Sequence, residues 1–109
     1  MKRVLFVCSQ NKLRSPTAEQ MFSGRPGFEV ASAGTDAQAD TPVDADSIEW
    51  ADVIFVMERT HRARLLKNFK VQLKNKRVVC LDIPDDYEFM DPALIRILET
   101  KVGPFFSRG

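Results

Sequence analysis

The sequence predicts an α/β fold, a three-layer domain in which helices cover both faces of a parallel sheet. Two observations predict it. Four short apolar segments alternate with segments of helical character, as expected for parallel strands joined by right-handed helical crossovers. Residues 53–57 are apolar at every position, as in strands buried on both faces. With 109 residues, the chain is expected to form one domain over residues 1–109.

The first half of the chain is predicted to hold two strands and two helices. Ser15 is the expected N-cap of the first helix, because Pro16 suits the first helical position, where its missing N–H needs no partner. Thr41 begins a capping-box pattern with Pro42 at the first position of the second helix. The expected strands cover residues 4–7 and 28–32, and the expected helices cover residues 16–22 and 42–50.

The second half repeats this pattern with two more strands and two more helices. Thr60 is the expected cap of the third helix, and Asp91 with Pro92 opens the fourth. A polar, acidic loop over residues 82–90 separates the last strand from the last helix. The expected strands cover residues 53–57 and 77–81, and the residues expected to face inward are Leu65, Leu66 and Phe69 on the third helix and Leu94, Ile95, Leu98 and Val102 on the fourth.

Composition and charge indicate which partners and which cellular setting to expect. The formal net charge is +1, and the basic stretch over residues 59–77 has no aromatic platform beside it, so no nucleic-acid partner is expected. No apolar run is long enough to cross a bilayer, so no membrane partner is expected either. Two cysteines, Cys8 and Cys80, make no disulfide framework, which favours a reduced, cytoplasmic setting.

The segment from Cys8 to Pro16 contains the residues expected to be catalytic. It joins the end of the first strand to the start of the first helix, and such a loop directs backbone N–H groups and the helix dipole toward a bound anion. Ligands of parallel α/β sheets bind at the carboxyl ends of the strands, which is where Cys8 lies. The sequence therefore predicts an anion site that contains a nucleophile.

The residue types in this loop fit phosphoryl transfer. A thiolate is the reactive form of cysteine, and positive charge around Cys8 stabilises it. The Arg14 guanidinium matches two oxygens of a phosphate group, and the Ser15 hydroxyl can donate to the thiolate. Attack by Cys8 on a phosphomonoester gives a phosphocysteine that water hydrolyses, and this route needs no metal or cofactor. The alternative is a buried cysteine that merely ends a strand, with an unrelated arginine nearby.

Residues 8–16 resemble the phosphate-binding signature, Cys-x5-Arg-Ser, of the low-molecular-weight protein tyrosine phosphatases. Residues 32–35, 51–58 and 81–87 resemble further segments of that family. The resemblance implies a flavodoxin-like fold, the phosphotyrosine phosphatase I-like arrangement with strand order 2-1-3-4, and hydrolysis of phosphorylated proteins or small phosphomonoesters. It implies that Cys8 is the nucleophile, that Arg14 holds phosphate, and that the following residues surround the substrate: Ser9, Gln10, Asn11, Lys12, Leu13, Arg14 and Ser15.

The resemblance has departures as well as matches. Asn11 and Ser32 are expected to hydrogen-bond and hold the loop in shape. Gln10 stands where the family usually has glycine, and Leu13 where it usually has a second cysteine. The chain lacks about one helix before residue 52, and with it a histidine that often joins the hydrogen bonds of the loop. The one histidine of this chain, His61, is expected to lie elsewhere.

A carboxylic acid must protonate the leaving oxygen in the first step. Asp85 is the preferred residue, because it closely follows the fourth strand and precedes an aromatic residue by two positions. Asp86 is one residue displaced, and Asp91 suits the N-cap of the last helix better. Asp82 is interpreted as a brace at the end of the strand.

Two other functions remain open from the sequence. The first is a phosphate- or anion-binding module that uses the same loop without turnover. The second is an arsenate reductase, which needs a resolving thiol; Cys80 is the other cysteine and is expected in the core. Phosphotyrosine, phosphoarginine and small phosphate esters all present the same tetrahedral group, and a cation at Lys12 favours acidic sequences around it.

Overall fold

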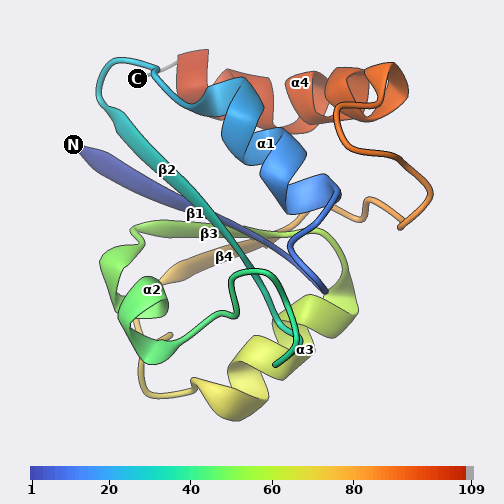
Figure 1. Ribbon diagram of the computed structural model, residues 1–109. Helices are drawn as coiled ribbons and strands as arrows, with labels where there is room; N and C mark the ends of the chain where they lie inside the picture. Colours follow the sequence, from blue (N-terminus) through green and yellow to red (C-terminus); the bar gives the residue numbers. More distant parts are fainter. Residues whose placement is uncertain (108–109) are drawn as a thin grey trace.

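The computed structural model describes residues 1–107 and contains a four-stranded parallel sheet in the order β2-β1-β3-β4, which confirms the predicted fold class and strand order. Figure 1 shows helices α1 and α4 on one face of the sheet and helices α2 and α3 on the other. The strands are β1 (Lys2–Cys8), β2 (Phe28–Gly34), β3 (Val53–Val56) and β4 (Arg77–Cys80), and the helices are α1 (Arg14–Phe22), α2 (Ala45–Trp50), α3 (Arg59–Asn68) and α4 (Pro92–Ser107).

The central strand β1 divides its side chains between two cores. Phe6 points toward α1 and α4, where it stacks with Phe22 and Phe106. Leu5 and Val7 point to the opposite face, into the core beneath α2 and α3. Each large apolar side chain that is fully buried contributes about 2 kcal/mol through the hydrophobic effect, so both cores stabilise the sheet.

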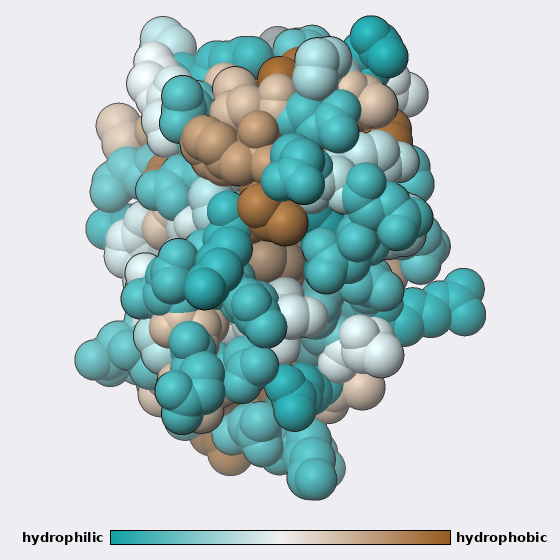
Figure 2. All heavy atoms as spheres, turned by 45° about the vertical axis from the view of Figure 1, so that its right-hand side comes forward, coloured by the Kyte–Doolittle hydropathy of each residue, from teal (hydrophilic) through white to brown (hydrophobic). Residues whose placement is uncertain are grey.

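None of the described helices meets the length and apolarity needed to cross a bilayer. The face of the molecule in Figure 2 is mostly hydrophilic, with a small group of apolar side chains in its upper half.

The first two helices begin at other residues than predicted. Helix α1 begins at Arg14 with Leu13 as N-cap, so Ser15 is not the cap. Pro16 is still tolerated, because N–H groups in the first helical turn have no intrahelical partner. Helix α2 begins at Ala45, and Asp44 is its N-cap through a hydrogen bond from the Ser47 N–H. The expected helical start at residue 42 is wrong, because that segment instead forms a parallel bridge to Gly34.

The third helix also differs from the prediction, whereas the fourth confirms it. Glu58, and not Thr60, is the N-cap of α3. Leu66 is 47% exposed, so its expected inward orientation is wrong: it lies one position beyond buried Leu65, on the solvent side of the helix. Helix α4 begins at Pro92 with Asp91 before it, as expected, since the Asp91 carboxylate accepts a hydrogen bond from the Ala93 N–H.

All strands run in parallel, so the loops that follow them meet at one edge of the sheet. We call residues 8–15, after β1, the phosphate loop, and residues 82–91, after β4, the acid loop. The segment that directly follows β2 supports the phosphate loop, because the N–H groups of Thr35 and Asp36 donate to the carbonyls of Cys8 and Ser9. Strand order reverses beside β1, which is where ligands of such sheets bind.

Candidate active site

A pocket of about 360 Å³ opens at this edge of the sheet. It brings together most of the residues expected around a phosphate, and it places one carboxylate from the acid loop opposite them. The lining residues are Cys8, Ser9, Gln10, Lys12, Leu13, Arg14 and Asp85. Asn11 and Ser15, also expected to bind substrate, are buried behind the pocket, where they hydrogen-bond within the loop.

The backbone of the phosphate loop is left free to bind an anion. Within residues 1–107, no N–H group of residues 9–13 donates to a protein acceptor. Consecutive free N–H groups in a loop before a helix form a concave anion site. Asn11 has a positive φ of 57°, a conformation that asparagine tolerates. Gln10 does not have a positive φ, so its side chain adds no backbone strain where the family usually has glycine.

A chain of hydrogen bonds reaches Cys8 from behind the pocket. The Asn11 side-chain amide donates to Ser32 Oγ and to Ser15 Oγ, each at 2.9 Å, which confirms the expected bond between Asn11 and Ser32. Ser32 in turn donates to the Glu19 carboxylate. Ser15 Oγ accepts from Asn11 and lies 2.9 Å from Cys8 Sγ, so its hydroxyl can donate to the sulfur; the Ala33 carbonyl, at 3.5 Å, is a more distant acceptor.

The Arg14 side chain is fixed in a buried position. It is 2% exposed, and its Nη1 donates to Glu58 Oε2 at 2.6 Å and to the Ile83 carbonyl at 2.7 Å. Buried charges are tolerated when they are paired and hydrogen-bonded. These bonds come from the segments after β3 and β4, so the folded sheet presents the guanidinium to the pocket in a set orientation. Glu58 was not predicted from the sequence to take part.

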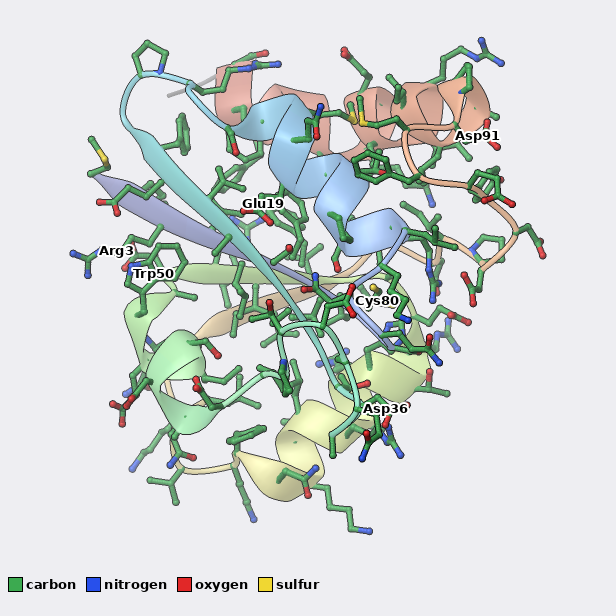
Figure 3. The ribbon with its side chains drawn as sticks, in the orientation of Figure 1. Arg3, Glu19, Asp36, Trp50, Cys80 and Asp91 are labelled. Carbon is green, nitrogen blue, oxygen red and sulfur yellow. The ribbon has the colours of Figure 1, made fainter. Side chains whose placement is uncertain are left out.

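The carboxylates that follow β4 differ in position. Asp85 Oδ1 lies 3.6 Å from Arg14 Nε, and of the acid-loop carboxylates only Asp85 lines the pocket in the described chain. Asp82 faces Arg59, with 3.8 Å between the charged atoms. In Figure 3, Asp91 lies beside the start of α4, well apart from Asp36, whose backbone donates to the phosphate loop.

The expectation that His61 lies away from the loop is wrong. His61 is 1% exposed, and its Nε2 lies 2.8 Å from Ser9 Oγ. Its Nδ1 accepts the Glu58 N–H at 3.0 Å. Burial, and next the positive charge of Arg14, lower the pKa of His61 from 6.5 to about 4. His61 lies three positions after the N-cap Glu58, the position from which a side chain can bond back to the N-cap backbone. This spacing is the sequence signal that could have placed His61 at the start of the helix.

Cys80 and Tyr87 lie outside the pocket. Cys80 is half-buried and packs against the core beneath α2 and α3, whereas Cys8 belongs to the core beneath α1 and α4. The two thiols therefore lie on opposite faces of the sheet. Tyr87 packs against the core beside α4 and is not among the residues that line the pocket, so its ring covers core.

Comparison with known proteins identifies the class. The profile of the family described as low molecular weight phosphotyrosine protein phosphatase matches residues 3–72. The chain belongs to this family and is a phosphatase of the low molecular weight class. The match includes the whole phosphate loop and His61 but ends before the acid loop. Among curated proteins, none matches the chain.

Solved structures agree on the fold. The YwlE arginine phosphatase from Geobacillus stearothermophilus has a TM-score of 0.83 at 22% identity, and the match covers 99% of this chain and 92% of that one. Wzb from Vibrio vulnificus, solved with benzylphosphonate, has a TM-score of 0.80 at 20% identity and covers 99% of both chains. The tyrosine phosphatase Wzb from Escherichia coli K30, solved with phosphate, has a TM-score of 0.79 at 19% identity, covering 98% and 97%.

Proposed function

We propose that this phosphatase hydrolyses protein phosphotyrosine through a phosphocysteine on Cys8, with Arg14 as the phosphate-binding cation and Asp85 as the general acid. The observation that carries the proposal is the composition of one pocket. It holds a thiol hydrogen-bonded to a buried hydroxyl, a fixed guanidinium, a run of free N–H groups and one facing carboxylate.

In the first step, Cys8 Sγ attacks phosphorus, so an S–P bond forms while the P–O bond to the leaving group breaks. The leaving oxygen takes a proton from the Asp85 carboxylic acid. The N–H groups of residues 9–13 and the Arg14 guanidinium stabilise the charge on the three equatorial oxygens. In the free protein Asp85 lies beside Arg14, at the mouth of the pocket from which the leaving group departs.

In the second step, a water molecule attacks the phosphocysteine and transfers a proton to the Asp85 carboxylate. The S–P bond breaks, and inorganic phosphate leaves. Ser15 Oγ, 2.9 Å from Cys8 Sγ, donates to the departing thiolate. Dividing one difficult displacement into two steps is the advantage of a covalent intermediate.

The substrate class follows from the family and from the pocket. The family description names phosphotyrosine proteins, and the mouth of the pocket offers the exposed Lys12 and the half-buried Leu13. A cation there favours acidic residues around the phosphorylated side chain. A reducing compartment keeps a nucleophilic thiol in its free form, which supports a cytoplasmic setting for the proposed activity.

The test is an assay of aryl phosphate and phosphotyrosine peptide hydrolysis by the wild type and by Cys8→Ser. The wild type is expected to turn over both, and Cys8→Ser to lose at least about 10⁴-fold in kcat, as removal of a nucleophile does. Acid quenching during turnover should trap one phosphate on the peptide that contains Cys8. Hydrolysis that persists in Cys8→Ser would refute the phosphocysteine.

Two controls separate the rival functions. A protein that binds phosphate without Cys8-dependent turnover is an anion-binding module. Thiol-dependent arsenate reduction that requires Cys80 would identify a reductase; the placement of the two thiols on opposite faces of the sheet argues against it. A phosphoarginine peptide in place of the phosphotyrosine peptide checks the substrate class, and faster hydrolysis of phosphoarginine would overturn our assignment.

A further inference from the structure

A second chain of hydrogen bonds reaches the pocket from α3. It begins at the Glu58 backbone, passes through the His61 ring and ends at the Ser9 hydroxyl. His61 is buried, and Ser9 lines the pocket next to Cys8. This chain lies apart from the one that joins Ser15, Asn11 and Ser32.

The direction of each bond in this chain follows from the chemistry of the groups. A backbone N–H only donates, so His61 Nδ1, 3.0 Å from the Glu58 nitrogen, is an acceptor without a proton. A neutral ring then carries its proton on Nε2 and donates it to Ser9 Oγ at 2.8 Å. Burial and the charge of Arg14 keep the ring neutral, since they lower its pKa to about 4.

The Ser9 hydroxyl is therefore left with a proton to donate. Its oxygen accepts from His61, and among the described residues no protein acceptor receives its own hydrogen. The Ser15 hydroxyl is different, because it has Cys8 Sγ as an acceptor. A hydroxyl that lines a phosphate pocket and lacks a protein acceptor is placed to donate to a phosphate oxygen.

We propose that His61 is a positioning residue that holds the Ser9 hydroxyl as an added donor to a non-bridging phosphate oxygen, an inference that rests on the proposed function. Ser9 would then bind substrate through its side chain as well as through its backbone N–H.

Glu58 links this donor to the main phosphate-binding cation. Its backbone N–H sets the proton position of His61, and its carboxylate holds Arg14. Glu58, at the start of α3, thus orients two donors of the pocket. Its backbone orients the Ser9 hydroxyl through His61, and its side chain orients the Arg14 guanidinium. This also explains why a buried histidine is kept beside a buried arginine, an arrangement that disfavours any positive charge on the ring.

The test uses two substitutions of His61 that each preserve one of its nitrogens. An Asn side chain places its amide oxygen near Nδ1 and keeps the bond from Glu58, but it cannot reach Ser9. A Gln side chain places its amide near Nε2 and can still donate to Ser9. Binding of inorganic phosphate is measured by calorimetry in the Cys8→Ser background, and also as competitive inhibition of aryl phosphate hydrolysis.

We expect Ser9→Ala and His61→Asn each to weaken phosphate binding about tenfold, the effect of one charge-assisted hydrogen bond. His61→Gln should stay within about threefold of the parent. Combining Ser9→Ala with His61→Asn should cost no more than either change alone, because they break the same contact. Unchanged binding in Ser9→Ala, or effects of the two changes that multiply, would overturn the proposal.

NMR spectroscopy of the unmodified His61 ring tests the proposal even if a His61 variant folds poorly. His61 is the one histidine in the sequence, so its ring ¹⁵N signals need no assignment. We expect a protonated Nε2 and an unprotonated Nδ1 at neutral pH; a ring protonated at Nδ1 would overturn the proposal. Phosphate binding in the Cys8→Ser background tests Ser9 even if turnover proves independent of Cys8, so failure of this inference and failure of the proposed function are distinguishable.

Discussion

The phosphate loop and the acid loop face each other across one pocket but are built in opposite ways. In the phosphate loop, Asn11, Arg14 and Ser15 are buried, and each has at least one hydrogen bond to a distant part of the chain or to another loop residue. In the acid loop, the Asp85 side chain is 64% exposed and Asp86 is exposed.

This difference separates binding from proton transfer. The groups that must hold the phosphate are fixed before substrate arrives, which avoids the cost of ordering them in the complex. The carboxylate that must release and regain a proton stays in contact with solvent and is held by one ion pair at 3.6 Å. Changes in the phosphate loop should therefore alter affinity and stability, whereas replacement of the Asp85 carboxyl group should alter turnover alone.

The largest effect is expected in the acid loop. Asp85→Asn should lower kcat for a phosphate ester with a poor leaving group by about 10²–10⁴-fold, because the leaving oxygen loses its proton donor. Inorganic phosphate should inhibit the variant as well as it inhibits the wild type, within a few-fold. Asp86→Asn is the matched control and should stay within about twofold; an equal loss in Asp86→Asn would reassign the acid.

The second effect is on stability at acid pH. His61 is kept neutral in the folded protein, with its pKa lowered to about 4 by burial first and Arg14 second, against the opposing charges of Glu58 and Asp85 and a smaller contribution from Arg64. The unfolded chain gains a proton near pH 6.5. Stability from this group is therefore complete above pH 6.5 and falls as the pH drops to about 4, by about 3 kcal/mol in total.

Urea unfolding at pH 7.5 and pH 4.5 measures this pH effect. His61→Gln removes the titrating ring, so its loss of stability between the two values should be smaller than that of the wild type. Equal losses in the two proteins would contradict the lowered pKa.

The third effect concerns the support of the phosphate loop by β2. A Cβ on Gly34 would lie 2.6 Å from the Ser9 carbonyl and 2.6 Å from Ala39 Cβ. Gly34→Ala should therefore cost about 2 kcal/mol, as overpacking does, and should weaken phosphate binding because the loop must shift. Gly103→Ala in α4, which meets nothing within 4 Å, is the control and should be neutral or slightly stabilising in thermal unfolding.

The smallest effect is expected at the end of the acid loop. Asp91→Ala should cost about 1 kcal/mol, the usual loss for an N-cap, since its carboxylate accepts the Ala93 N–H. Aryl phosphate turnover should remain at the wild-type rate. A drop in kcat comparable to that of Asp85→Asn would show that Asp91 takes part in proton transfer.

Patterns of residue types predict the parts of this protein that depend on neighbouring residues. Alternating apolar segments predicted the parallel sheet, and Cys8 and Arg14 within one short loop predicted the anion site. These features are local, because the strand end, the loop and the helix start that direct N–H groups toward an anion follow one another in the sequence. The helix starts were less well predicted: proline at position 42 fits the first turn of a helix, but Asp44 provides the cap that is used.

Other parts of the site depend on which loops meet at the edge of the sheet, and these follow from the tertiary fold. Only the pairing of β1 with β3, and of β3 with β4, brings Glu58 and Ile83 to Arg14 and Asp85 to the pocket. His61 lies 52 positions from Ser9 in the sequence, and their contact exists because α3 starts directly after β3. Hydrogen bonds between such distant residues follow from strand order and burial, which no local pattern of residues specifies.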